Sequence, residues 1–139
     1  MTATPLTTRQ TVDAFFTRFG GGDLPGLLDL FADRVDFNVA GPANIPWTGR
    51  RSTKEEIAEF FGILGKELTE AEEFTISTIL VDGEHAVAMA RGVFGVRSTG
   101  KKFTNDFALH FTVIAGQITG YNMYEDTHAI SPAFAASPR

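Results

Sequence analysis

The sequence predicts an α+β fold in which helices come first and a meander of long strands follows. In the first half, apolar residues recur at the helical spacing i, i+3, i+4, i+7. After Glu73, apolar and polar residues alternate in long runs that are separated by short turns. Connections this short force neighbouring strands to be antiparallel. Helices followed by such a meander are typical of α+β domains.

The first half contains three predicted helices, one strand and one long loop. The first helix begins at Thr8 and ends at the glycines 20–22, and Asp23 can cap the second. Ser/Thr and Glu residues within 52–56 are spaced as in capping boxes and open the third. The strand covers 35–39, and loop 41–49 carries the only tryptophan. The apolar helix faces comprise Val12, Phe15, Phe16 and Phe19; Leu24, Leu27, Leu28 and Phe31; and Ile57, Phe60, Phe61, Leu64 and Leu68.

The second half contains four predicted strands. They cover residues 74–81, 85–96, 103–114 and 117–124, with turn sequences rich in Gly, Asp, Ser and Thr between them. The tail from Ser131 onward is rich in Ala and Pro, and we expect it to be loosely held.

Length and composition exclude several classes of protein. The 139 residues predict one domain, 1–139, with its core at about 8–128. The net charge of −5 argues against nucleic acid as a partner, and the basic pairs at 50–51 and 101–102 lie in predicted turns, where we expect solvated charge. The absence of cysteine excludes disulfides, thiolate catalysis and thiol-ligated metal. No signal-peptide pattern and no membrane-spanning apolar run is present, which predicts a cytoplasmic protein without a membrane partner.

Three stretches carry a resemblance to a known superfamily. They are the sequence Gly-Gly-Asp-Leu-Pro-Gly-Leu-Leu-Asp-Leu-Phe-Ala-Asp at 21–33, Trp-Thr-Gly-Arg at 47–50 with the capped helix that follows, and segments between Thr99 and Thr127. In these stretches the chain resembles the nuclear transport factor 2-like superfamily, which includes SnoaL-like polyketide cyclases, ketosteroid isomerases and limonene epoxide hydrolases. The resemblance spans about residues 8–128.

The resemblance implies a cone-shaped curved antiparallel sheet packed on N-terminal helices, a nuclear transport factor 2-like or cystatin-like roll. It also implies a pocket between the helices and the sheet, and a homodimer formed through the outer sheet face. Because this fold carries many chemistries, the activity has to be argued from individual residues.

The residues of ketosteroid isomerase chemistry are missing. That chemistry uses a carboxylate base together with a tyrosine and a protonated carboxyl that stabilise an enolate oxygen. Alignment places Phe15 at the tyrosine, Val39 at the base, Leu109 at the second carboxyl and Phe61 at a supporting tyrosine. A shift of one residue would place Asn38 at the base position, and an amide is not a base. The chain is therefore not a standard ketosteroid isomerase.

The aspartate pair of limonene epoxide hydrolases is not reproduced either. Arg91 lies at or near the arginine of those enzymes, but Val93 and Met123 stand where carboxylates are expected. Met123 also replaces the acid–base carboxylate of SnoaL-like cyclases.

Alternation along the strands predicts which side chains line the pocket. In the strand 103–114, counting by twos places Asn105, Phe107 and Leu109 on the pocket face. In the last strand it places Tyr121, Met123 and Glu125 on the same face. With residues from the helices, the loop and the remaining strands, the predicted ligand-binding set is Phe15, Phe19, Val39, Trp47, Phe60, Phe61, Met89, Asn105, Phe107, Leu109, Tyr121 and Met123.

Three residues are candidates for catalysis. Arg91 either anchors an oxygen of the ligand, pairs with Glu125, or faces the outer surface of the sheet. Glu125 either lies at the pocket mouth, where an apolar wall raises the pKa of a carboxyl, or is a solvated charge at the strand end together with Asp126. Asp126 could also cap or brace a neighbouring element. His110 faces away from the pocket unless the register slips by one residue, and in that case it becomes an acid–base candidate.

The leading hypothesis is a SnoaL-like or ketosteroid isomerase-like protein that binds a small, largely apolar molecule with one oxygen function. If it is an enzyme, we expect cofactor-free acid–base chemistry of the isomerase, cyclase or hydratase type. No spacing of His, Asp and Glu resembles a metal site. The alternatives are a non-catalytic ligand-binding or dimerisation module, and a limonene-epoxide-hydrolase-like hydrolase.

Overall fold

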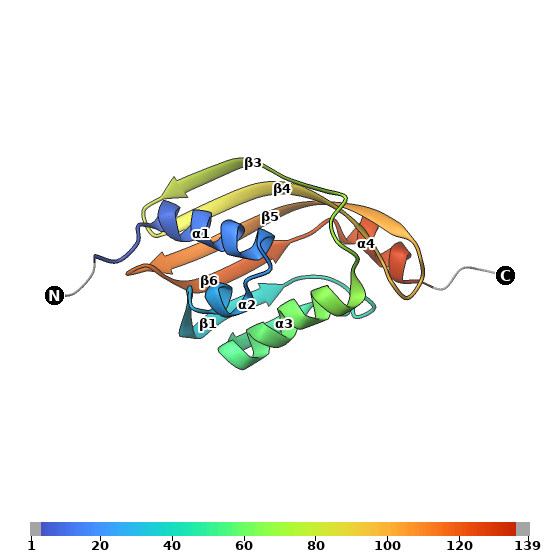
Figure 1. Ribbon diagram of the computed structural model, residues 1–139, viewed down its shortest axis with the longest axis horizontal. Coiled ribbons are helices and arrows are strands. Elements are labelled where there is room, and N and C mark those ends of the chain that lie inside the picture. The colour runs from blue at the N-terminus through green and yellow to red at the C-terminus, as the bar shows by residue number, and fades with distance from the viewer. Residues whose placement is uncertain (1–3, 136–139) are drawn as a thin grey trace.

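The computed structural model describes residues 4–135, which form four helices and six strands. Their order confirms the α+β class (Figure 1). No helix within these residues is long and apolar enough to cross a bilayer. In chain order the elements are α1 (Thr8–Gly20), α2 (Leu24–Leu28), β1 (Phe31–Val39), β2 (Gly49–Thr53), α3 (Lys54–Glu67), β3 (Glu73–Asp82), β4 (His85–Gly95), β5 (Lys102–Ile114), β6 (Gln117–Tyr124) and α4 (Thr127–Phe134).

The strands form one curved sheet in the order β2-β1-β6-β5-β4-β3. Helices α1, α2 and α3 lie on one side of it, and α4 lies at one end (Figure 1). We call the side under the helices the inner face and the other side the outer face. Strands β3 to β6 pair antiparallel as predicted, whereas β1 and β6 pair parallel. These two strands are joined by most of the chain, so no short turn imposes an antiparallel direction on them.

The structure differs from the predicted elements in three places. Phe31 opens β1 and does not belong to α2. Strand β2 was expected to be part of a loop and turn, and it forms because Arg50 and Arg51 pair with β1. The expectation of a loose tail is wrong up to Phe134, because α4 buries Ile130 and is capped by the Asp126 side chain. Residues 136–139 of that tail lie outside the described part of the chain.

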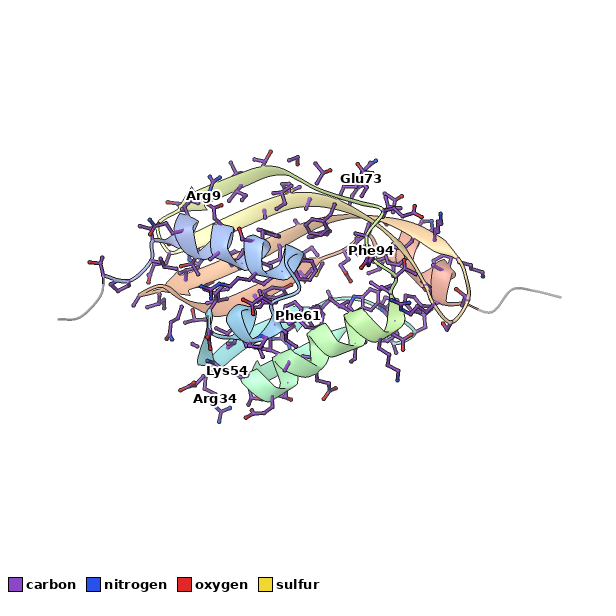
Figure 2. All side chains as sticks on the ribbon, in the orientation of Figure 1. Arg9, Arg34, Lys54, Phe61, Glu73 and Phe94 are labelled. Atoms are coloured by element: carbon purple, nitrogen blue, oxygen red, sulfur yellow. The ribbon has the colours of Figure 1, made fainter. Side chains whose placement is uncertain are left out.

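The core is built from aromatic rings contributed by both layers. Phe37 of β1 and Tyr121 of β6 stack with ring centroids 4.3 Å apart, and Phe15 of α1 meets Phe111 of β5 edge to face at 5.1 Å. Each fully buried ring of this kind stabilises the fold by roughly 1.5–3 kcal/mol relative to an exposed one. Figure 2 shows Phe61 and Phe94 in the space between the helices and the sheet.

Candidate functional site

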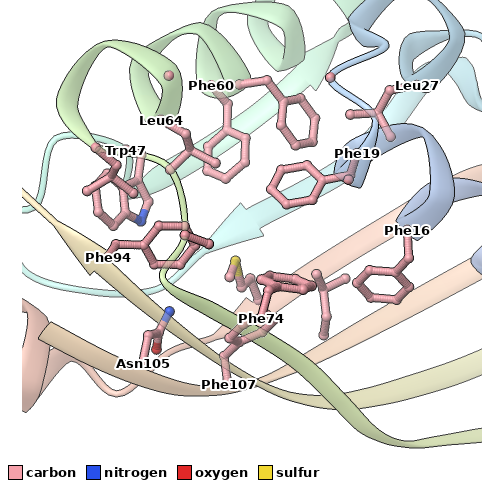
Figure 3. A pocket seen from close by; sticks show the side chains of 18 of the residues that line it. Phe16, Phe19, Leu27, Trp47, Phe60, Leu64, Phe74, Phe94, Asn105 and Phe107 are labelled. Carbon is pink, nitrogen blue, oxygen red and sulfur yellow. The ribbon is translucent and has the colours of Figure 1, made fainter.

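A cavity of about 830 Å³ lies between the helices and the inner face of the sheet. Its wall is mostly apolar and combines rings from both layers (Figure 3). Such a lining favours a ligand with a large apolar surface. The phenylalanines that line the cavity are Phe15, Phe16, Phe19, Phe60, Phe61, Phe74, Phe94, Phe103 and Phe107.

A carboxyl group held by two neutral donors forms the main polar feature of the wall. Glu125 follows β6 directly and lines the cavity. The indole Nε1–H of Trp47 donates to Glu125 Oε2 at 2.9 Å, and Asn105 Nδ2 donates to Oε1 at 3.2 Å. Asn105 Oδ1 accepts a hydrogen bond from the backbone N–H of Asp126 at 3.0 Å, and this bond orients the amide. Both oxygens of Glu125 are therefore fixed in position.

The protonation of Glu125 reflects a balance between burial and these hydrogen bonds. Burial raises the pKa of Glu125 to about 7, and the bonds from Trp47 and Asn105 oppose that rise. Within residues 4–135, Glu125 forms no ion pair with a basic side chain. A carboxyl group with a pKa near neutrality can both accept and release a proton at physiological pH.

Tyr121 adds a second polar group to the same row of β6. Its side chain is buried, and burial together with the charge of Glu125 raises the pKa of its hydroxyl, which stays protonated. Within the described residues the hydroxyl donates only to Met123 Sδ, at 4.0 Å, and a thioether is a weak acceptor. An oxygen atom of a ligand would offer this O–H a better acceptor.

Packing against α4 and β2 holds Trp47 in place. Its ring meets Phe134 of α4 edge to face at 5.4 Å, and only 1% of Trp47 is exposed. Arg51 of β2 donates from Nη1 to the Trp47 carbonyl at 2.8 Å, with its guanidinium carbon 5.1 Å from the ring centroid of Phe60. Burial lowers the pKa of Arg51, so this residue is not the solvated turn charge that was expected. Trp47 thus lies beneath α4, not over an open mouth.

The structure places two predicted pocket residues on the outer face. Arg91 Nε forms an ion pair with Asp106 Oδ1 at 2.8 Å, and about half of each side chain is exposed. Met89, two residues earlier on β4, is 44% exposed. The placement of Met89 in the pocket is wrong, and of the three alternatives for Arg91 the structure shows the outer surface of the sheet. Arg91 pairs in register with Asp106, whose side chain points opposite to that of Asn105.

His110 and Val39 also lie outside the cavity wall. His110 faces outward from β5, where its Nε2 lies 3.0 Å from Nδ1 of His85. This confirms the predicted register of the strand, and the alternative in which His110 is an acid–base group of the pocket is wrong. Val39 is fully buried in the core and does not line the cavity, so its placement in the pocket is wrong as well.

The remaining predicted residues do line the cavity. They are Phe15, Phe19, Trp47, Phe60, Phe61, Asn105, Phe107, Leu109, Tyr121, Met123 and Glu125. Phe74, Phe94 and Phe103 also line the cavity and were not predicted from the sequence. Phe103 lies two residues before Asn105 on the same row of β5, so the alternation that found Asn105 also points to Phe103.

The residues offer no metal site of ordinary composition. No group of three or more His, Asp or Glu side chains within the described residues could hold a metal ion, and the sequence has no cysteine. Among the described residues, the arrangement needed by an epoxide hydrolase of the limonene type is also missing, because Arg91 points away from the cavity and Met123 stands where a carboxylate is expected.

Comparison with known proteins identifies the family. The profile of the SnoaL-like domain matches residues 12–121, and the chain therefore belongs to the SnoaL-like domain family. No curated protein sequence matches the chain.

Solved structures agree in fold over nearly the whole chain. A nuclear transport factor 2-like protein of Burkholderia xenovorans has 24% identity and a TM-score of 0.81, and one of Burkholderia thailandensis has 23% and 0.84; each match covers 94% of this chain and 98% of the other. A Catenulispora acidiphila protein with a ketosteroid isomerase-like fold, in complex with trimethylamine, has 17% identity and a TM-score of 0.76, covering 94% of this chain and 96% of that one. At these identities the likeness establishes the fold alone.

Proposed function

We propose that the protein binds a small, largely apolar molecule in this cavity and moves a proton on it with Glu125, without a cofactor. The observation that carries the proposal is the Glu125 carboxyl group on an aromatic wall, with both oxygens held by Trp47 and Asn105 and with its pKa raised to about 7. Buried titratable groups with such a shift cluster at functional sites.

Each polar group has a role in this chemistry. Glu125 removes a proton from a carbon next to a carbonyl group and returns it at the same or a neighbouring position. The Tyr121 hydroxyl donates to the carbonyl oxygen, where negative charge develops. The phenylalanine wall limits the access of water. A positioned general base contributes roughly 10²–10⁴-fold to the rate.

A non-catalytic binding module of the same fold is the second candidate. The large share of apolar wall favours it, because binding needs only the cavity and its rings. The two candidates differ in one outcome: a binding module leaves every bound molecule chemically unchanged.

Deuterium exchange separates the two candidates. We would incubate the protein in D₂O with a panel of cyclic and aryl ketones, follow exchange of the α-protons by ¹H NMR, and measure binding by thermal shift. The wild type is expected to accelerate exchange, Glu125→Gln to slow it by at least about 10²-fold with binding retained, and Tyr121→Phe to slow it less. Binding without exchange would favour the non-catalytic module, and exchange that survives Glu125→Gln would remove Glu125 from the mechanism.

A further inference from the structure

We propose that the ligand of this cavity carries a substituted ammonium group, which pairs with the Glu125 carboxylate and lies against the aromatic rings around it. This inference rests on the proposed function, because it names the class of molecule that the same cavity takes. The charged group buried in the cavity wall is the acid Glu125, and Arg91 does not line the cavity. The cavity therefore favours a positively charged ligand group.

Among residues 4–135, no positively charged side chain pairs with Glu125. Its two hydrogen-bond donors, the Trp47 indole and the Asn105 amide, are both neutral. A carboxylate removed from water is costly unless it is paired with a charge of opposite sign. An ammonium group on the ligand supplies that charge, whereas a carbonyl group does not.

Aromatic rings lie at the same end of the cavity. The ring centroid of Phe103 lies 6.4 Å from that of Trp47 and 5.9 Å from that of Phe94, and all three side chains line the cavity. Phe103 also lies two residues from Asn105 on β5. Faces of aromatic rings attract cations, and groups of such rings bind quaternary ammonium ions.

The two basic residues of the cavity wall bind backbone carbonyl groups and not Glu125. Arg18 donates from Nη1 to the Gly26 carbonyl at 2.6 Å, and Arg97 donates from Nε to the Leu68 carbonyl at 2.9 Å. Neither contributes an ion pair to Glu125. The wall also carries two exposed acids, Asp23 and Glu70, whose negative charges equal the two positive charges of these arginines. The negative charge of Glu125 is therefore left without a compensating positive charge among the described residues of the wall.

The test compares two probes of the same shape and different charge. Phenyltrimethylammonium and its neutral isostere tert-butylbenzene are titrated into the full chain at pH 8 by calorimetry. We expect the cation to bind about tenfold or more tightly than the isostere. In Glu125→Gln this preference should fall to within about twofold, with the affinity for the isostere unchanged.

Asp106→Asn is the matched control, because it also removes one carboxylate but on the outer face, and it should keep the preference. Circular dichroism establishes that each variant is folded. Equal or tighter binding of the isostere, failure of the cation to bind, or a preference that survives Glu125→Gln would each overturn the inference. Ketone exchange that depends on Glu125 would still support the proposed function in those cases. A clear preference for the cation without any exchange would support the inference and overturn catalysis.

Discussion

Glu125 is subject to two opposing effects on its pKa, and the structure shows which is larger. Burial favours the neutral acid, while the bonds from Trp47 and Asn105 favour the carboxylate. Burial is the larger effect, so the folded protein binds this proton more tightly than the unfolded chain does. The hydrogen bonds from Trp47 and Asn105 do not cancel the rise in the pKa, but they fix the position of the carboxyl group that binds the proton.

This pKa predicts how stability depends on pH. The pKa of Glu125 rises from an ordinary value of 4.5 to about 7 on folding. Between these values the native state holds more protons than the unfolded state, so the free energy of unfolding falls as the pH rises from 4.5 through 7 and levels off above about 8. The full effect of this one group is up to about 3 kcal/mol.

Urea unfolding of the wild type and Glu125→Gln at pH 5 and pH 8 measures this effect. Other groups titrate in both proteins, so the difference between their pH dependences isolates Glu125. We expect Glu125→Gln to gain stability relative to the wild type at the higher pH. Equal pH dependences would contradict the raised pKa.

Trp47→Phe tests the indole hydrogen bond separately. The variant keeps an aromatic ring beneath α4 but removes the donor to Glu125 Oε2. Because that bond favours the carboxylate, the pKa of Glu125 should rise further, by about one unit. NMR titration of the side-chain carboxyl carbons measures the shift. Asp106→Asn, which lies on the outer face and leaves both donors to Glu125 in place, is the control, and an unchanged titration of Trp47→Phe would contradict the assignment.

The faces of β4 were predicted wrongly from the sequence. The inner row of this strand carries the small residues Ala86, Ala88 and Ala90 before it reaches Phe94 in the cavity wall, while Met89 points outward. Small side chains on the inner row let α1 pack across the strand. The resemblance that placed Arg91 near a catalytic arginine suggested the wrong face, and the pairing of Arg91 with Asp106 places it on the outer face.

At the element scale, α4 and the loop before β2 form one unit that positions Trp47. Ser131 Oγ donates to Asn44 Oδ1 at 3.0 Å, and Asn44 Nδ2 donates back to the Ser131 carbonyl at 3.1 Å. Thr99 donates to the Ala133 carbonyl at 2.6 Å and ties the helix to the turn before β5. Phe134 of this unit packs against Trp47, and Trp47 donates a hydrogen bond to the Glu125 carboxyl group.

Phe134→Ala tests that unit. Phe134 is partly buried against Trp47, so its truncation should cost about 1–3 kcal/mol and loosen the cover over the indole. Trp47 is the only tryptophan, so its fluorescence reports directly on this site, and we expect emission at longer wavelength. Ser131→Ala should cost about 1 kcal/mol or less and leave the emission in place. Unchanged emission in Phe134→Ala would show that α4 does not shield Trp47.

Elements with strong periodicity could be predicted from the sequence, and elements defined by their partners could not. Strands β3 to β6 lie within about one residue of their predicted ends, because long alternating runs and turn residues delimit them. Strand β2 is short, polar and without alternation, and only its pairing with β1 makes it a strand. Asp126 caps an element as predicted, but the Ala- and Pro-rich composition after Ser131 hid the helix α4 that it caps.

At the scale of the whole molecule, the cavity and the outer face lie on opposite sides of the sheet. The outer face carries Met89 and Tyr124, which are 44% and 56% exposed, beside the Arg91–Asp106 ion pair. A second copy placed by a two-fold axis would bury both apolar side chains and bring each ion pair near its counterpart. The helices over the cavity would remain outside such an interface, so a dimer leaves access to the cavity unchanged.

We therefore propose a homodimer through the outer face, and light scattering tests it. The wild type should show a mass near twice the 15.1 kDa of one chain at micromolar concentration. Met89→Asp combined with Tyr124→Asp places four carboxylates in the symmetric interface and should yield monomers that still bind ligand, since neither residue lines the cavity. Leu6→Asp changes an apolar residue with 41% exposure in the segment before α1 and should stay dimeric. A wild-type monomer at every concentration, or a double variant that remains dimeric, would show that this face is not the interface, and the exposed Met89 and Tyr124 would then be ordinary surface residues.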